Sequence, residues 1–175
     1  MQPIFLTGFM GAGKTTVGCL LADMLCLQFV DTDRLIEEEL GMSIAEIFVK
    51  NSNDFFREAE NKILRRLAAR RDTVIATGGG MPCYENNLEI IKSCGTSFYI
   101  KWKQKDLFHR LKIDGVEKRP LLAGKTDREF ANFIARELKK RKTFYEQADC
   151  IVCGEDDEII ARKIALHFRP LVTKS

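Results

Sequence analysis

A glycine-rich run near the start of the chain has the residue types and the spacing of a phosphate-binding loop. Residues 8–15 read Gly-Phe-Met-Gly-Ala-Gly-Lys-Thr and match the pattern Gly-x-x-x-x-Gly-Lys-[Ser/Thr] in full. Glycines let the backbone wrap so that its N–H groups face phosphate oxygens, and the helix expected next adds the positive end of its dipole. The motif predicts nucleotide binding and leaves the reaction open.

The side chains of this run have separate expected tasks. Lys14 is placed to reach the β- and γ-phosphates of ATP, and the Thr15 hydroxyl is placed to ligate Mg²⁺ directly. The residues of this segment that we expect to contact ATP are Gly11, Ala12, Gly13, Lys14, Thr15 and Thr16.

Two carboxylates one residue apart, Asp31 and Asp33, follow the second apolar run of the chain. At the carboxyl edge of a parallel sheet they would lie where ligands of open α/β folds bind. One of them could hold water of the Mg²⁺ shell, while the other accepts hydrogen bonds from a substrate hydroxyl. On the residues alone, an equally good interpretation is that Asp33 only caps the next helix.

An arginine and three glycines provide a second group of candidate residues. Arg57, on an expected helix, could bind a carboxylate ligand in a bidentate way, or it could only pair with Glu60 three residues later. Gly78, Gly79 and Gly80 follow the third apolar run. Three glycines there cost backbone entropy, which predicts a close approach to a ligand or an unusual turn.

The elements that must position these residues alternate between strand and helix. Period-2 and period-3.6 patterns predict strands at 4–7, 28–31, 73–76, 97–101 and 150–152, and helices at 14–25, 34–40, 43–49, 54–70, 103–112, 127–146 and 156–168. Strands separated by helices imply a five-stranded parallel sheet covered on both faces, an α/β fold of three layers. We expect one domain over residues 1–175, with a mobile lid at about 113–126.

Composition limits the classes of partner. The net charge of +3 is too small for a nucleic-acid-binding face, and no segment has the roughly 20 apolar residues of a membrane span. No basic leader precedes the first apolar run, so a cytoplasmic location is expected. Cys150 and Cys153 form a Cys-x-x-Cys pair without a second pair, which disfavours a structural zinc site.

Other classes of protein with a phosphate-binding loop fit the sequence poorly. The Asn-Lys-x-Asp motif by which GTPases read guanine is absent, because Asn61-Lys62 is followed by Ile63-Leu64. No Asp-x-x-Gly switch motif appears, and motor or transporter ATPases are usually larger chains. A small kinase that acts on a metabolite or a nucleotide remains.

The order and spacing of six motifs resemble the shikimate kinase family. They are the phosphate loop, Asp-Thr-Asp at 31–33, Phe-Arg-x-x-Glu at 56–60, Ile-Ala-Thr-Gly-Gly-Gly at 75–80, Arg-Pro-Leu-Leu at 119–122, and Arg-x-x-x-Tyr at 141–145. The match spans residues 4 to about 168. Only the phosphate loop is specific by itself, but the six together are hard to obtain otherwise.

The resemblance implies a role for each matching residue on the acceptor side. Asp33 would bind shikimate hydroxyls and orient the reacting hydroxyl or take its proton. Arg57 and Arg141 would grip the shikimate carboxylate, with Gly79 and Gly80 approaching or donating from the backbone.

On the nucleotide side, the resemblance implies that Asp31 lies near the water shell of Mg²⁺. Arg119, on the lid, would close over ATP and stabilise charge during transfer, so that Lys14, Asp33 and Arg119 form the expected catalytic set. Arg110 would pack on adenine, and the segment 153–156 would lie near the base.

The expected reaction is therefore the Mg²⁺-dependent transfer of a phosphoryl group from ATP to the 3-hydroxyl of shikimate, on the pathway to chorismate and aromatic amino acids. We expect a monomer with a small-molecule substrate and no nucleic-acid or membrane partner. Two rivals stay open: another small kinase, of the gluconate or nucleotide type, and an ATP-binding protein that catalyses nothing.

Overall fold

The computed structural model describes residues 1–115 and 124–168. Within these ranges the strands are β1 (Ile4–Thr7), β2 (Gln28–Asp31), β3 (Thr73–Ala76), β4 (Thr96–Lys101) and β5 (Cys150–Cys153). The α-helices are α1 (Lys14–Leu25), α2 (Thr32–Leu40), α3 (Ile44–Lys50), α4 (Asn53–Ala68), α5 (Asn87–Cys94), α6 (Gln104–Ile113), α7 (Asp127–Tyr145) and α8 (Asp157–Phe168). None of these described helices is both long enough and apolar enough to cross a bilayer.

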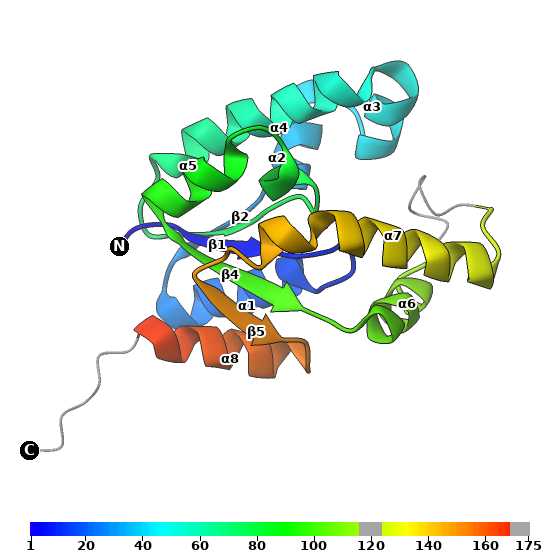
Figure 1. Cartoon of the computed structure of the whole chain (residues 1–175). Helices are drawn as coiled ribbons and strands as arrows, with labels where there is room; N and C mark the ends of the chain where they lie inside the picture. Colours follow the sequence, from blue (N-terminus) through cyan, green and yellow to red (C-terminus); the bar gives the residue numbers. More distant parts are fainter. Residues whose placement is uncertain (116–123, 169–175) are drawn as a thin grey trace, which may run out of the picture.

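The strands form one parallel sheet in the order β2-β3-β1-β4-β5 (Figure 1). β1 lies at its centre and pairs with β3 on one side and β4 on the other. All four of its residues are buried, as expected for a parallel strand covered on both faces. The predicted α/β fold with five parallel strands is confirmed.

Alternate residues of the central strand face two separate cores. Ile4 and Leu6 pack into a core between the sheet and helices α1 and α8. Phe5, which lies between them in the strand, packs against α4 and α5 on the other face. The period-2 alternation of a strand produces this division, because successive side chains point to opposite faces. Figure 1 shows the helices above and below the sheet, in three layers.

One helix was not predicted from the sequence, and another begins two residues earlier than predicted. No helix was predicted between 80 and 97, yet α5 occupies Asn87–Cys94 after a 3-10 turn at Met81–Cys83. The expected parallel sheet already called for this helix, since consecutive parallel strands need a long crossover that is usually helical. The second helix begins at Thr32 rather than at Arg34.

Side-chain caps determine where the helices around the ligand-binding edge begin. Asp31 caps α2 by accepting from the amides of Asp33 and Arg34. Ser43 begins α3 and Thr126 begins α7, each with a capping box that satisfies two helix-end N–H groups. Most of the predicted lid at 113–126, namely residues 116–123, lies outside the described residues.

Candidate active site

The phosphate-binding loop connects β1 to α1 and has the backbone that its glycines predict. Gly8, Gly11 and Gly13 have φ values of 142°, 75° and 85°, a region that side chains strongly disfavour. Gly13 is the residue before α1, so the helix N-terminus opens directly onto the loop. The Nζ of Lys14 donates to the carbonyl oxygens of Gly8 and Phe9, both at 2.9 Å, which holds its ammonium group over the loop.

A hydrogen bond joins the first turn of α1 to the start of α2. The Thr15 hydroxyl donates to Asp31 Oδ2 at 2.6 Å, while Asp31 Oδ1 accepts from the amides that begin α2. Asp31, and not Asp33, is therefore the cap of this helix, and the carboxylate of Asp33 is left for another role. Thr16, the next residue of α1, is exposed.

A cavity of about 420 Å³ lies at the carboxyl edge of the sheet. Its walls come from the phosphate loop, α2, α3, α4, the triple glycine turn after β3, and α7. The volume falls within the range that suits a small metabolite. Four predicted acceptor-side elements thus meet at one cavity: Asp33, Arg57, Arg141 and the glycines 78–80.

The cavity and the phosphate loop share a wall. A β-carbon added to Gly79 would lie 3.3 Å from the amide nitrogen of Met10 and 3.4 Å from the carbonyl oxygen of Gly8. The glycine turn therefore packs directly on the phosphate loop, and Met10 itself lines the cavity. A molecule in the cavity and phosphates on the loop would be immediate neighbours.

Two carboxylates approach the backbone of Gly78. A β-carbon added there would lie 2.5 Å from Glu60 Oε1 and 2.6 Å from Asp33 Oδ1, so these oxygens lie within about 5 Å of each other. Both oxygens are buried, and neither has a hydrogen-bond partner among the described residues. Buried acceptors without partners are costly, which indicates that a bound ligand or water completes them.

Burial is the main cause that raises the pKa of both acids. The pKa of Asp33 rises from 3.8 to about 6, with the charge of Asp31 adding to the effect and Lys14 opposing it. The pKa of Glu60 rises from 4.5 to about 7, although its ion pair with Arg57 lowers it. Desolvation wins at Glu60 because the side chain is 1% exposed and only one of its oxygens is paired.

Arg57 pairs with Glu60 and also lines the cavity, so the ion pair with Glu60 does not remove it from the site. Its Nη1 contacts Glu60 Oε2, and its guanidinium group lies over Gly80, where an added β-carbon would be 2.4 Å away. A side chain at that position would therefore displace the guanidinium group. The guanidinium group lines the cavity from α4.

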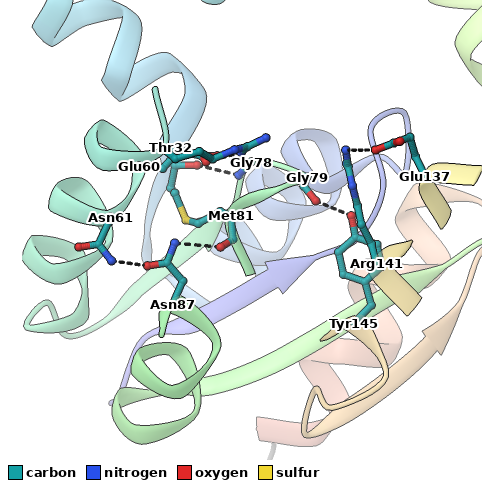
Figure 2. Close-up of polar contacts among 11 residues, drawn as sticks. Thr32, Glu60, Asn61, Gly78, Gly79, Met81, Asn87, Glu137, Arg141 and Tyr145 are labelled. Carbon is teal, nitrogen blue, oxygen red and sulfur yellow. Dashed lines mark hydrogen bonds and ion pairs between the residues drawn. The ribbon is translucent and has the colours of Figure 1, made fainter. Parts of the chain in front are cut away.

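Arg141 approaches the same turn from the opposite wall. Figure 2 shows its guanidinium group paired with Glu137, one helical turn earlier, at 2.9 Å. The Arg141 side chain is 13% exposed. Its Nη1 would lie 3.6 Å from a β-carbon on Gly79, and its Cζ lies 5.4 Å from the centre of the Phe9 ring. The predicted pair of arginines therefore converges on one turn.

One wall of the cavity, formed by α3 and Glu37, was not predicted from the sequence. Glu37 lines the cavity and accepts from the amide of Ile44 at 2.8 Å, which joins α2 to the start of α3. Phe48 of α3 packs on Phe56 of α4 with ring centroids 4.8 Å apart and planes tilted by 52°, and both rings line the cavity. The apolar spacing of this short helix was visible in the sequence, but its destination depends on tertiary packing.

Arg110 lies beside the phosphate loop on the side away from the cavity. Its Nε donates to the Gly11 carbonyl at 2.9 Å, its Nη2 pairs with Asp157 at 2.9 Å, and its Cζ lies 4.6 Å from the ring centre of Trp102. Gly154 packs against the same indole ring. Arg110 and segment 153–156, which were expected on the same side of the nucleotide, thus meet in one place. Trp102 and Asp157, which join them there, were not among the predicted site residues.

Arg119, predicted to act from the lid, lies outside the described residues. The remaining geometry can bring two reactants together. A glycine loop at a helix N-terminus suits phosphates. The adjoining cavity offers two arginines for an anion, together with carboxylates that can accept from hydroxyl groups.

Comparisons with known proteins agree with this chemistry. A family model described as shikimate kinase matches residues 10–169. A shikimate kinase from Bacteroides fragilis is 43% identical over 155 residues, which cover 89% of this chain and 86% of that protein. The crystal structure of a shikimate kinase from Bacteroides thetaiotaomicron superposes with a TM-score of 0.90 at 38% identity, covering 95% of this chain and 97% of that one.

A shikimate kinase from Acinetobacter baumannii, solved in complex with shikimate, superposes with a TM-score of 0.84 at 34% identity and covers 94% of this chain and 90% of that one. The family model matches far more than half of the chain, and the relatives match over nearly their whole length. The chain therefore belongs to the shikimate kinase family, and it is a kinase that uses ATP.

Proposed function

We propose that the protein transfers the γ-phosphoryl group of ATP to the 3-hydroxyl of shikimate, giving ADP and shikimate 3-phosphate. The observation that carries this proposal is the convergence of Asp33, Arg57 and Arg141 on one cavity that shares a wall with the phosphate loop. Shikimate has a carboxylate at one end of its ring and hydroxyl groups at the other. The cavity has partners for both kinds of group.

The carboxylate of shikimate is assigned to the two arginines and the glycine turn. Arg57 and Arg141 flank the turn from opposite walls, and both side chains are mostly buried, at 18% and 13% exposure. Charged hydrogen bonds in such a setting are stronger than at an open surface. Gly79 and Gly80, which line the cavity between the two arginines, add backbone N–H groups.

The hydroxyl groups of shikimate are assigned to Asp33. With a pKa raised to about 6, Asp33 is mostly ionised near neutral pH, so its unpartnered oxygen can accept from a hydroxyl or take its proton. Phosphoryl transfer needs little covalent help from a protein. The main contributions are positioning of the attacking oxygen and stabilisation of charge on the phosphoryl group.

The nucleotide and Mg²⁺ are assigned to the phosphate loop and its neighbours. Thr15 and Asp31 supply oxygen ligands of the kind that Mg²⁺ prefers, and their oxygens lie 2.6 Å apart, so both can belong to one metal site. Direct ligation is assigned to Thr15 and water-mediated ligation to Asp31. Bound Mg²⁺ would neutralise phosphate charge. Lys14 would contact the β- and γ-phosphates, Arg110 would contact adenine, and Arg119 would close over ATP.

The wider setting is proposed in the same way. The whole chain would form one domain, with a lid at 113–126, and would act as a monomer in the cytoplasm. Its product would enter the route to chorismate and the aromatic amino acids. Family membership and the small acidic-and-basic cavity support this assignment.

The reaction is tested by ADP release in a coupled assay with ATP, Mg²⁺ and one acceptor at a time. We expect turnover with shikimate, and at most traces with gluconate or nucleoside monophosphates, which do not match the paired arginines and the glycine turn. Turnover with gluconate or a nucleotide alone would replace the proposed acceptor. ATP binding without turnover on any acceptor would favour a binding protein.

Replacing Asp33 by asparagine should nearly abolish turnover, by about 10²–10⁴-fold, because the amide cannot take the proton or accept as strongly from the hydroxyl. ATP affinity, measured by titration calorimetry, should change less than about twofold. A parallel loss of ATP affinity and rate would contradict the assigned role.

Replacing Arg57 by alanine should raise the KM for shikimate by about 10–100-fold, because a buried charged hydrogen bond contributes roughly 1.5–3 kcal/mol. Arg65→Ala is the matched control, since Arg65 lies on the same helix with exposed contacts to Asn61 and Asn86. Its KM should equal that of the unmodified protein. An unchanged KM in Arg57→Ala would remove this arginine from the acceptor site.

Glu60 should make the protein less stable as the pH rises. Its folded pKa of about 7 exceeds the ordinary 4.5, so its contribution is fully present below pH 4.5 and is lost by about pH 7. The loss in unfolding free energy is on the order of 2–3 kcal/mol. In Glu60→Gln this component of the pH dependence should disappear, as measured by urea unfolding at pH 5 and pH 8. Equal slopes in both proteins would contradict the burial argument.

A further inference from the structure

Most backbone N–H and C=O groups of the glycine turn, residues 78–80, have a hydrogen-bond partner. The carbonyl of Gly78 accepts from the amide of Met81 at 3.1 Å, and the carbonyl of Gly80 accepts from the amide of Cys83 at 3.0 Å. These bonds form the short 3-10 turn at Met81–Cys83. The backbone alone thus satisfies two carbonyls and two amides of the turn.

Side chains from three helices complete the turn, as Figure 2 shows. The amide of Gly78 donates to the Thr32 hydroxyl of α2 at 2.8 Å. The carbonyl of Met81 accepts from the Asn87 amide of α5 at 2.9 Å. The carbonyl of Gly79 accepts from the Tyr145 hydroxyl of α7.

Two adjacent N–H groups, those of Gly79 and Gly80, remain. Among residues 1–115 and 124–168, neither donates a hydrogen bond to the protein. Both glycines line the cavity between Arg57 and Arg141. Consecutive N–H groups without acceptors form a concavity that attracts anions.

The peptide that joins Gly79 to Gly80 is the part of the turn most able to reorient. A trans peptide is planar, so its carbonyl and the following N–H point in opposite directions. Between two glycines, rotation of this unit meets no β-carbon and costs little. Rotation would exchange the N–H of Gly80 for the carbonyl oxygen of Gly79, which repels an anion.

Tyr145 is suited to prevent this rotation. Its ring is 1% exposed and stacks on Tyr99 of β4, with centroids 5.0 Å apart and planes 28° apart, so the position of its hydroxyl is fixed. Burial raises its pKa, and the hydroxyl therefore keeps its proton and remains a donor across the physiological range.

We propose that Tyr145 is a positioning residue whose hydroxyl holds the carbonyl of Gly79 toward α7, so that the N–H group of Gly80, next to that of Gly79, stays directed at the carboxylate of the acceptor. The inference rests on the proposed function, because it takes the anionic end of the acceptor to lie on this turn. The assigned step is binding of the acceptor, and Tyr145 acts through the peptide without touching the ligand.

The test compares Tyr145→Phe with Tyr99→Phe. Each substitution removes one hydroxyl from the same ring stack, but only the first removes the bond to Gly79. We expect Tyr145→Phe to raise the KM for shikimate by about 5–20-fold, with the KM for ATP unchanged and kcat within about threefold. Tyr99→Phe should leave all three constants unchanged. Equal behaviour of the two variants would overturn the proposal.

The methyl ester of shikimate separates positioning from general damage to the fold. The ester lacks the anionic oxygen that the N–H groups bind, so Tyr145→Phe and the unmodified protein should have kcat/KM values for the ester that agree within about twofold. An equal loss of kcat/KM on the acid and on the ester would show that Tyr145 only supports the fold.

A third variant distinguishes the turn from the neighbouring arginine. The Arg141 guanidinium group lies close enough to Tyr145 to affect its pKa. In an Arg141→Ala background, Tyr145→Phe should still lower kcat/KM for shikimate several-fold. No additional loss would assign the effect to Arg141 and overturn the role of the peptide. Inactivity of the unmodified protein on shikimate would instead refute the proposed function itself.

Discussion

The absence of side chains at the end of β3 is the constraint on which the site depends. β-carbons on Gly78 and Gly80 would lie within 2.6 Å of the Asp33 and Glu60 carboxylates and of the Arg57 guanidinium group. Charged groups from two helices can therefore meet over bare backbone. Any larger residue would push them apart, since interiors pack too densely to absorb an extra methyl group.

The charges of the site are arranged at a cost that a ligand can offset. Asp33 and Glu60 each have one buried oxygen without a hydrogen-bond partner among the described residues. Arg57 and Arg141 each use some of their N–H donors in an ion pair with a glutamate on the same helix. Partly satisfied buried networks are unfavourable in isolation. A molecule with hydroxyl groups and one carboxylate can donate to the unpaired carboxylate oxygens and accept from the arginines. A molecule that lacks these groups would leave buried polar atoms unpaired, which gives the site its specificity.

Much of this site could be predicted from the sequence because its parts are local. The phosphate loop depends on spacing within one segment. Periodicity places Asp33 and Arg57 near the starts of helices, and the resemblance to the family supplied their expected roles. The contributions of Glu37 and Trp102 could not be predicted, because each depends on a contact between two elements: α2 with the start of α3 for Glu37, and the end of β4 with the phosphate loop, far away in the chain, for Trp102. Helix α5 was missed for a different reason: the expected parallel sheet required a crossover between β3 and β4, but this helix is only eight residues long and gives a short periodic pattern.

The Asp31 carboxylate links helix α1, which follows the phosphate loop, to the start of helix α2. Asp31 accepts from Thr15 with one oxygen and holds the first amides of α2 with the other, and α2 carries Asp33 into the cavity. Any shift of that carboxylate when Thr15 changes partner would be transmitted to the acceptor side through a single rigid group. Thermodynamic linkage makes such coupling mutual, so occupancy at either end would alter affinity at the other by the same factor. Cooperation between co-substrates can thus arise without a second subunit or a separate regulatory site.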